Sequence, residues 1–580
     1  MSGSEMKNAG ARPNMTGAHV LAAALKRHGV ETIFAQSNPP LLLLAADEQG
    51  IRQIGYRTEN AGAVMADAYA RVSHRVPVIT AQNGPAATLL VPGLAEALKA
   101  SIPIVAIVQD VHSKMTDKNA FQELDHLDLF KGAAKWVRRV SECDRLDDYI
   151  DMAFTAAASG RPGPAVLIVP MDVFAEVAGE TPGKDRVKSL GHFPLDRTVA
   201  DPERIARAAE LLASAKAPVV IAGGGVHTSG AAHALADFQD VSSIPVATTT
   251  MGKGAVDENH PLSIGVIGYF MGNRSRTRHM RDMITGADVV LLVGNRTNQN
   301  GTDSWTLYPP DATYIHLDID GQEIGRNYEP EVRLLGDARL TLEALTAAMK
   351  AQDTAKRQAT RSGVERRIAE GITAWKQDLE TIDYGKSPVR PEAMMRDLDA
   401  LLPEGAIVVS DASYSSIWIA NFLTSRHAGQ RFLTPRGLAG LGWGLPFAMG
   451  AKLADPEKPV IALVGDGGFA HVWSELETAR RMDIPVTVIV LNNQILGYQK
   501  HGEKASIGNY TSACDFKAVD HAAIARACGV EGVRVEKPEA FQPALRDAIG
   551  SGKTTVIDVM TDERAFPPIT MWDEASRLDY

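Results

Sequence analysis

Cysteine is scarce in this chain, since its 580 residues include only Cys143, Cys514 and Cys528. Thiols so few and so widely spaced exclude a disulfide framework and a zinc site built on cysteine. Long apolar runs are also missing, because none approaches the ~18–20 residues that a membrane-spanning helix needs. An excess of positive charge is absent as well. The net charge of −10 argues against nucleic acid or an anionic membrane as a partner.

The length exceeds what one hydrophobic core can hold. At ~150 residues per domain, 580 residues predict three or four domains. Hydrophobic residues make up 45% and charged residues 22%, which is typical of globular proteins in water. Residues 1–14 are polar and lack the apolar core of a signal peptide. We therefore expect a loose N-terminal arm and a cytoplasmic protein.

Strand-like apolar runs alternate with helical patterns along almost the whole chain, which predicts an α/β fold. Polar stretches at 178–200 and 351–391 interrupt this alternation and divide the chain into three parts. We expect three consecutive domains, each with a doubly wound parallel sheet. Their predicted limits are 14–182, 200–350 and 390–565, followed by a tail, 566–580, whose aromatic and proline residues make it a candidate lid over a water-sensitive site.

Two of the strand-like runs end in residues that suit a metal ion bound to a diphosphate. Residues 459–464 lead into Gly465-Asp466-Gly467-Gly468, and residues 485–491 lead into Asn492-Asn493. Mg²⁺ takes oxygen ligands and commonly completes its octahedron with phosphate oxygens and water. Glycines let the backbone approach a diphosphate, and a helix expected from Ala470 would offer its N-terminus to that anion. Each motif alone is also an ordinary turn between strands.

Together the two motifs resemble those of the thiamine diphosphate (ThDP) enzymes, in which Gly-Asp-Gly is followed some thirty residues later by Asn-Asn. The resemblance extends over about residues 15–560 and points to the group of acetolactate synthases, oxalyl-CoA decarboxylases and 2-hydroxyacyl-CoA lyases. It implies that Asp466 and Asn493 bind Mg²⁺ through their side chains and Ile495 through its carbonyl. It also implies that Gly467, Gly468 and Asn493 lie against the cofactor.

The segment Glu59-Asn60-Ala61, which opens a helix rich in small residues, resembles another signature of the ThDP enzymes. In that family this Glu hydrogen-bonds the pyrimidine ring and helps its imino form to remove the proton from the thiazolium carbon. Carboxyl groups in partly dry surroundings can share a proton at neutral pH. A Glu in a first helical turn also simply complements the helix dipole, by ~0.3–1 kcal/mol. The resemblance further implies cofactor contact by Asn83 and an active-site role for Gln122, which is otherwise a surface amide near a turn.

The glycine-rich stretch 437–446 resembles the segment that wraps under ThDP in this family. There, a bulky apolar residue between the two rings enforces the bent form of the cofactor. Leu441 occupies that position, although it could also be an ordinary core leucine. The surrounding glycines favour a close approach of the backbone to a ligand.

The middle part has strand ends, glycines and acidic residues arranged as in nucleotide-binding domains. In acetolactate synthases this domain holds FAD, in the CoA enzymes it holds the ADP part of coenzyme A, and in many ThDP enzymes it is empty. The predicted contacts for CoA or FAD are Gly224, Gly225, Lys253, Arg296, Asp318 and Asp320.

The reaction is predicted from departures within this resemblance. Asn492-Asn493-Gln494 resembles acetolactate synthases, but Tyr498-Gln499-Lys500-His501 follows where they have Met and then Trp, and Gln36-Ser37-Asn38-Pro39-Pro40 replaces their glycine-rich turn. We therefore expect a lyase that cleaves a 2-hydroxyacyl-CoA reversibly to formyl-CoA and an aldehyde or ketone. The alternative is an acetolactate synthase-like carboligase acting on pyruvate or another 2-oxo acid.

Gln494 is placed beside the reacting carbon, but an amide is not a base, which leaves proton transfer to the cofactor, His501 or His126. A different class, a catalytically silent structural subunit, is disfavoured because Glu59, Asp466 and Asn493 are all present. In the family, the residue corresponding to Glu59 meets the metal site of a second subunit. The resemblance therefore implies a homo-oligomer, specifically a dimer of dimers.

Overall fold

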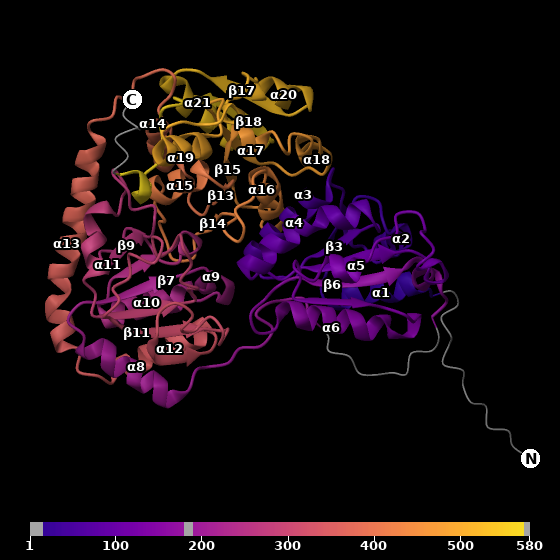
Figure 1. Ribbon diagram of the computed structural model, residues 1–580, viewed down its shortest axis with the longest axis horizontal. Coiled ribbons are helices and arrows are strands. Elements are labelled where there is room, and N and C mark those ends of the chain that lie inside the picture. The colour runs from indigo at the N-terminus through magenta and orange to yellow at the C-terminus, as the bar shows by residue number, and fades with distance from the viewer. Residues whose placement is uncertain (1–14, 179–188, 574–580) are drawn as a thin grey trace, which may run out of the picture. The chain divides into compact units, whose positions relative to one another are not determined.

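The computed structural model describes residues 15–178 and 189–573, which divide into two compact units (Figure 1). The first consists of residues up to Ala70 together with His74–Leu195, and the second consists of Arg71–Ser73 and Asp196–Tyr580. The predicted N-terminal arm, residues 179–188 of the first polar stretch and the last seven residues of the tail lie outside the described residues.

The first unit contains a six-stranded, fully parallel sheet in the order β2-β1-β3-β4-β6-β5. Its central strands are buried on both faces, as parallel strands covered by helices are. The strands are β1 (Thr32–Phe34), β2 (Arg52–Ile54), β3 (Val78–Ala81), β4 (Val105–Asp110), β5 (Trp136–Arg139) and β6 (Ala165–Pro170). The helices are α1 (Gly17–Arg27), α2 (Pro40–Glu48), α3 (Glu59–Ser73), α4 (Pro85–Ala100), α5 (His126–Leu129), α6 (Leu146–Ala158) and α7 (Met171–Ala175).

The second unit contains two further parallel sheets of six strands. The central sheet has the order β12-β11-β10-β7-β8-β9. Its strands are β7 (Pro218–Ala222), β8 (Val246–Thr248), β9 (Ser263–Val266), β10 (Val289–Val293), β11 (Thr313–Asp318) and β12 (Pro330–Leu335). The helices of this part are α8 (Pro202–Ser214), α9 (Gly225–Ser229), α10 (Ala232–Ser242), α11 (Arg281–Thr285), α12 (Ala338–Lys350) and α13 (Ala355–Leu379).

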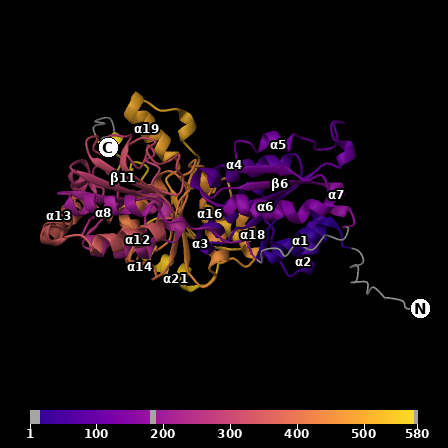
Figure 2. The ribbon, with the colours of Figure 1, turned by 90° about the horizontal axis from the view of Figure 1, so that it is seen from below.

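The third sheet has the order β14-β13-β15-β16-β18-β17, with helices on both faces (Figure 2). Its strands are β13 (Ile407–Ser410), β14 (Phe432–Leu433), β15 (Val460–Gly465), β16 (Thr487–Asn492), β17 (Glu531–Val535) and β18 (Thr555–Met560). Its helices are α14 (Pro391–Leu401), α15 (Tyr414–Phe422), α16 (Gly444–Ala454), α17 (Asp466–Phe469), α18 (Glu475–Arg481), α19 (Gly497–Ile507), α20 (His521–Ala527) and α21 (Phe541–Gly550). The predicted α/β fold with three parallel sheets is confirmed.

The central sheet has two hydrophobic clusters of its own, but the core of the third sheet extends into the central part. One hydrophobic cluster joins Tyr269 and Phe270, which follow β9, to Trp418 and Phe422 of α15. Helix α13 runs along the outside of the second unit (Figure 1) and adds Trp375 to the same cluster. The polar stretch predicted to be a linker is therefore largely a 25-residue helix that packs against both sheets.

The third sheet brings the two predicted metal-binding strand ends together. β15 pairs in parallel with β16, and Gly465 lies opposite Leu491 in the register. The carboxyl ends of neighbouring parallel strands form the crevice where α/β proteins bind ligands. The predicted start of a helix at Ala470 is wrong, however: the four-residue α17 begins at Asp466, and the next helix, α18, begins at Glu475.

Candidate active site

Asp466 lies directly beyond β15 and is fixed by backbone donors. Its Oδ2 accepts a 2.7 Å hydrogen bond from the N–H of Gln494, and its Oδ1 accepts a 2.8 Å bond from the N–H of Gly467. On the neighbouring strand end, Asn493 turns its Oδ1 toward the N–H of Ile495 at 3.3 Å. Asp466, Asn493 and Ile495 all line one cavity of about 400 Å³.

The donors in this cavity fit Mg²⁺ with a diphosphate. Burial raises the pKa of Asp466 to about 7, which means that its carboxylate lacks a compensating positive charge. A divalent cation would supply that charge, and one carboxylate, one amide oxygen and one carbonyl leave the remaining positions for phosphate oxygens and water. Among residues 15–178 and 189–573, no group of three or more His, Cys, Asp or Glu side chains is placed to hold a metal ion.

Asp411, which the sequence analysis missed, anchors the glycine-rich loop beside this site. It follows β13 and is almost fully buried, and it accepts hydrogen bonds from the N–H groups of Gly442 at 3.0 Å and Trp443 at 3.2 Å. Burial raises its pKa to about 6. A Cβ on Gly468 would lie 2.1 Å from its Oδ2, so that position requires glycine. The available signal was an apolar strand ending in Asp, as in β15.

The same cavity is lined by Leu441, Gly467 and Gly468, which the resemblance placed against ThDP. Polar side chains line this cavity as well. Tyr269 and Asn300 reach it from the central part of the second unit, and Arg436 and Tyr498 reach it from the third. At about 400 Å³ the cavity falls within the ~300–1,000 Å³ of small-molecule sites.

Gln494 participates through its backbone. Its φ is +61°, its N–H holds Asp466, and its carbonyl accepts a 2.8 Å bond from the N–H of Phe516. Its side chain is half-buried and does not line the cavity. The predicted placement of this amide beside the reacting carbon stays a prediction.

Glu59 is the first residue of α3, in the first unit. Thr58 caps the helix by accepting a 3.3 Å hydrogen bond from the N–H of Ala61. Only 5% of Glu59 is exposed, and burial raises the pKa of its carboxyl above the usual range. A raised pKa favours the protonated form of this carboxyl. An acid held for its charge at a helix terminus would lie more exposed.

Asn83 and Gln122 lie together in the first unit. The Nδ2 of Asn83 donates to the carbonyl of Gln122 at 3.0 Å, and the Gln122 side chain accepts a 2.9 Å bond from Gln82. Next to them His126 is buried and occupied at both nitrogens, by the N–H of Gly84 at 3.0 Å and by Asp110 at 3.2 Å. Because neither nitrogen is available, we drop His126 as a candidate base.

His501 is equally enclosed. Its Nδ1 lies 2.7 Å from the hydroxyl of Tyr414, and burial lowers its pKa to about 4, so it is neutral at pH 7. Trp572, from the described part of the tail, packs against His501, Tyr414 and Tyr498. These contacts place the tail next to residues that line the cavity, as a lid requires, and the lid itself stays a prediction.

The glycines predicted to contact a nucleotide are explained by packing of strand ends. A Cβ on Gly225 would lie 2.6 Å from the Cα of Gly294, and one on Gly223 would lie 2.3 Å from the Gly294 carbonyl. Gly224 faces Met251. Glycine is needed at these positions because any side chain would prevent the ends of β7 and β10 from packing together.

The predicted polar contacts of the central part also have structural partners. Lys253 is buried, and its Nζ bonds both oxygens of Glu258 at 2.8 and 2.9 Å and the Leu423 carbonyl at 2.7 Å. All three of its donors are thus used, so Lys253 cannot hold a nucleotide. Asp318 caps the N–H of Asp320 at 2.9 Å, in a turn after β11. Arg296 is half-buried after β10.

We expect Gly225→Ala to destabilise the protein with no ligand present. Overpacking of this kind costs ~1–3 kcal/mol, so the thermal midpoint of the ligand-free protein should fall by several degrees. Gly363→Ala is the matched control, because Gly363 is exposed in α13 with no atom near its Cβ position. Equal melting of Gly225→Ala and the parent protein would contradict the packing explanation.

No helix within the described part of the chain is long and apolar enough to cross a membrane. Three family descriptions match the three sheets in order. These are Thiamine pyrophosphate enzyme, N-terminal TPP binding domain, at residues 15–129; central domain, at 205–345; and C-terminal TPP binding domain, at 411–559. TPP is another abbreviation for ThDP.

Relatives resemble the chain over nearly its full length. Two are named probable acetolactate synthase large subunits: one from Methanococcus aeolicus is 32% identical, and one from Methanocaldococcus jannaschii is 33% identical, each covering 94% of this chain and 92% of the relative. An acetolactate synthase large subunit of Parasynechococcus marenigrum is 33% identical over 95% of this chain and 88% of its own length. The chain therefore belongs to the ThDP-dependent enzymes of the acetolactate synthase group.

Proposed function

We propose that the protein makes or breaks a carbon–carbon bond next to a carbonyl carbon, with ThDP and Mg²⁺ as cofactors. The observation that carries this is the joint position of Asp466, Asn493 and Leu441 around one cavity. Bound ThDP would supply the carbanion chemistry. Asp466, Asn493 and the Ile495 carbonyl would hold the metal, and Asp411 would fix the loop that carries Leu441.

The first candidate reaction is decarboxylation of a 2-oxo acid followed by transfer of the acyl unit to a second carbonyl compound, as the names of the relatives suggest. Arg436 supports this reading, because its guanidinium lines the cavity and can bind a carboxylate in a planar, two-pronged manner. It lies over the ring of Phe270 at 5.1 Å and donates to the hydroxyl of Ser416, which limits its orientations.

The second candidate is cleavage of a 2-hydroxyacyl-CoA to formyl-CoA and an aldehyde or ketone. It is favoured by the polar wall of the cavity, where Tyr498 and Gln499 stand in place of the residues usual in acetolactate synthases. Burial raises the pKa of Tyr498, which is hydrogen-bonded to Tyr269, to about 12. Its hydroxyl therefore stays protonated and can orient a substrate oxygen but not remove its proton.

The two candidates differ in substrate, product and colour. Purified protein loaded with ThDP and Mg²⁺ should be assayed with pyruvate, for acetolactate, and with lactyl-CoA or 2-hydroxyisobutyryl-CoA, for formyl-CoA. Acetolactate without thioester cleavage supports the first candidate, and thioester cleavage without acetolactate supports the second. A yellow protein would indicate bound FAD and favour the first. If the ThDP-saturated protein shows neither activity, the proposal that it makes or breaks a carbon–carbon bond with ThDP is contradicted.

Assembly belongs to the same proposal. We infer a homo-oligomer built as a dimer of dimers, in which Glu59 of one protomer serves a cofactor held by its partner. The small-molecule substrate follows from the size of the cavity. Sedimentation of the ThDP-loaded protein would give the oligomeric state, and a monomer that retains full activity would contradict this arrangement.

A further inference from the structure

Asp558 is a buried carboxylate next to the strand that ends in the Asn-Asn motif. It lies within β18, which pairs in parallel with β16, and β16 ends at Asn492. The side chain of Asp558 is fully buried and does not line the catalytic cavity. Burial of a carboxylate is costly unless its charge is compensated by hydrogen bonds and a cation. Its contacts therefore indicate why the fold keeps a charged group at this position.

One oxygen of Asp558 fixes the residue that precedes a proposed metal ligand. Its Oδ1 accepts a 2.9 Å hydrogen bond from the Nδ2 of Asn492. The same amide nitrogen donates to the Val519 carbonyl at 3.0 Å, and the Asn492 carbonyl accepts a 2.9 Å bond from the N–H of Thr561. Because Asn492 is held by both its side chain and its backbone, the next residue, Asn493, is limited in where it can present its amide to the cavity.

The other oxygen of Asp558 fixes a loop that runs beside the metal site. Its Oδ2 accepts a 3.0 Å hydrogen bond from the N–H of His521. Earlier in the same loop, the backbone of residues 514–516 joins that of residues 494–496 through two hydrogen bonds of 2.8 Å. The segment that contains Ile495, whose carbonyl is the third proposed ligand, is thus supported by a loop that Asp558 holds at its end.

The ring of His521 extends this support to the segment that carries Asp466. Its centroid lies 5.6 Å from that of Phe469, the last residue of α17, and its Nδ1 accepts a 3.2 Å hydrogen bond from the indole N–H of Trp473. Helix α17 begins with Asp466. The segments of all three proposed ligands are therefore connected to Asp558 by a few buried contacts.

Arg534 balances the charge of Asp558 from the neighbouring strand. It lies opposite Asp558 in the register of β17 and β18, and its Nη1 donates to Oδ2 at 3.0 Å. Together with the donors of Asn492 and His521, this bond leaves the carboxylate oriented and compensated. Groups that are fixed in this way behind a metal ligand determine the direction in which the ligand points.

We propose that Asp558 is a positioning residue of the metal site, which acts through Asn492 and the His521 loop to set the proposed ligands Asn493 and Ile495. The inference rests on the metal site of the proposed function and adds a residue to it. In a purely structural role, Asp558 would only hold β16, β17 and β18 together. Its loss would then lower the stability of the protein and leave the metal affinity of the folded protein unchanged.

The test is Mn²⁺ binding to the protein in excess ThDP, followed by electron paramagnetic resonance, in which the signal of free Mn²⁺ falls as the metal is bound. Mn²⁺ takes the same oxygen ligands as Mg²⁺, and a titration without protein corrects for Mn²⁺ held by free ThDP. Asp558→Asn keeps the size of the side chain, but its amide nitrogen cannot accept the bonds from His521 and Arg534. We expect this variant to bind Mn²⁺ about 10–100-fold more weakly, with kcat at saturating metal close to the parental value.

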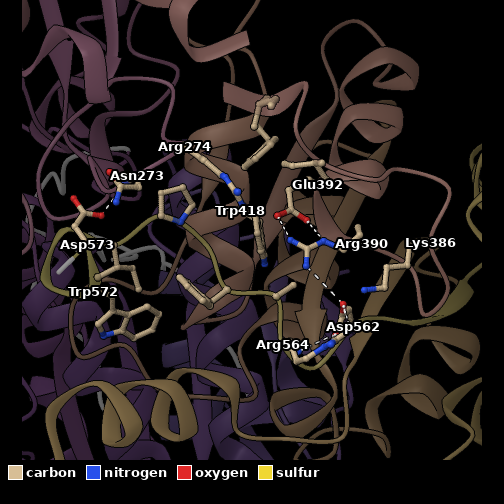
Figure 3. Close-up of a pocket in the computed structure, with 17 residues that line it drawn as sticks. Asn273, Arg274, Lys386, Arg390, Glu392, Trp418, Asp562, Arg564, Trp572 and Asp573 are labelled. Carbon is tan, nitrogen blue, oxygen red and sulfur yellow. Dashed lines mark hydrogen bonds and ion pairs between the residues drawn. The ribbon is translucent and has the colours of Figure 1, made fainter. Parts of the chain in front are cut away.

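Asp562→Asn is the matched control. Asp562 follows the same strand, is also buried, and lies 3.6 Å from Arg390 and 3.2 Å from Arg564 at the wall of a second cavity (Figure 3). This variant removes a buried carboxylate paired with arginine that does not contact Asn492. It should lose stability and keep the parental affinity for Mn²⁺. Thermal unfolding of the metal-free variants measures the loss of stability separately.

Asn492→Ala tests the same connection from its other end, and it carries the test alone if Asp558→Asn does not fold. It should also weaken Mn²⁺ binding. The double variant should bind more tightly than the product of the two single effects implies, because residues in one hydrogen-bond network are coupled. Parental Mn²⁺ affinity in either single variant, effects that multiply fully, or an equal loss in Asp562→Asn would overturn the inference and leave the metal site in place. Absence of Mn²⁺ binding by the parent protein would overturn the proposed metal site, and this inference with it.

Discussion

Replacement of Asp466 by alanine is expected to abolish Mg²⁺-dependent binding of ThDP and, with it, turnover. This side chain is the only carboxylate among the proposed metal ligands. Even removal of a group that merely supports a ligand costs about 10–100-fold in metal affinity, so loss of the carboxylate itself should cost roughly 100-fold or more. Quenching of tryptophan fluorescence by ThDP, with and without Mg²⁺, would measure the change.

Asp466→Asn is the informative companion variant, because it keeps the shape of the side chain and removes its charge. Burial raises the pKa of Asp466 from 3.8 to about 7, so between these values the unfolded state releases a proton that the folded state retains. This group therefore destabilises the metal-free protein as the pH rises through that range. Asp466→Asn should remove this pH dependence, so the thermal midpoint of the metal-free variant should change less between pH 4 and pH 7 than that of the parent, even though the amide leaves one of the N–H groups of Gly467 and Gln494 without its acceptor. The variant should be inactive.

The pair of variants separates function from folding. A purely structural aspartate would leave Mg²⁺-dependent binding of ThDP intact in the asparagine variant. Normal Mg²⁺-dependent activity of Asp466→Ala would contradict the assignment of the metal site altogether. Asp483→Asn is a suitable control, since Asp483 is an exposed turn residue that does not line the cavity.

Glu59→Gln is expected to lower kcat by about 10²–10⁴-fold, the usual contribution of a positioned acid or base, while ThDP still binds. The amide keeps the size of the side chain and can donate a hydrogen bond, but it cannot exchange a proton. If Glu59 served only to complement the dipole of α3, its loss would cost ~0.3–1 kcal/mol of stability and leave kcat unchanged. Steady-state kinetics and thermal unfolding on the same samples distinguish the two roles.

Glu48→Gln provides the matched control, because Glu48 also lies on a helix of the first unit and is exposed. It should alter neither kcat nor ThDP affinity. Parental turnover by Glu59→Gln at saturating ThDP would exclude the proposed role of this carboxyl. Rescue of activity at low pH would not be expected, since an amide does not titrate.

The fold and the metal-binding strand ends could be predicted because they depend on local pattern. Apolar runs such as Val460–Gly465 and Thr487–Asn492 can only be buried parallel strands, and the residues that follow adjacent strands must meet at one edge of the sheet. The sequence predicts that Gly468 lies against the cofactor, and this residue does line the catalytic cavity. The side chain that demands a glycine there, Asp411, is remote in sequence and could not be inferred locally.

Other assignments failed because their partners are remote in sequence. The charge of Lys253 suggested a phosphate contact, but Glu258 and the carbonyl of Leu423 consume its donors, and the second lies 170 residues away. The sequence predicts a ligand contact for Gly225, whereas in the structure the backbone of Gly294 packs against this residue.

The cluster shared by the central and third sheets has a consequence for dissection of the enzyme. A fragment that begins after α13 would lack Tyr269, Phe270 and Trp375. Their packing partners Trp418 and Phe422 would then expose a large hydrophobic surface to water. It would also lose part of the rim of the catalytic cavity. The C-terminal portion is therefore not a separable module, and transplanting it into another scaffold would require its central neighbour to travel with it.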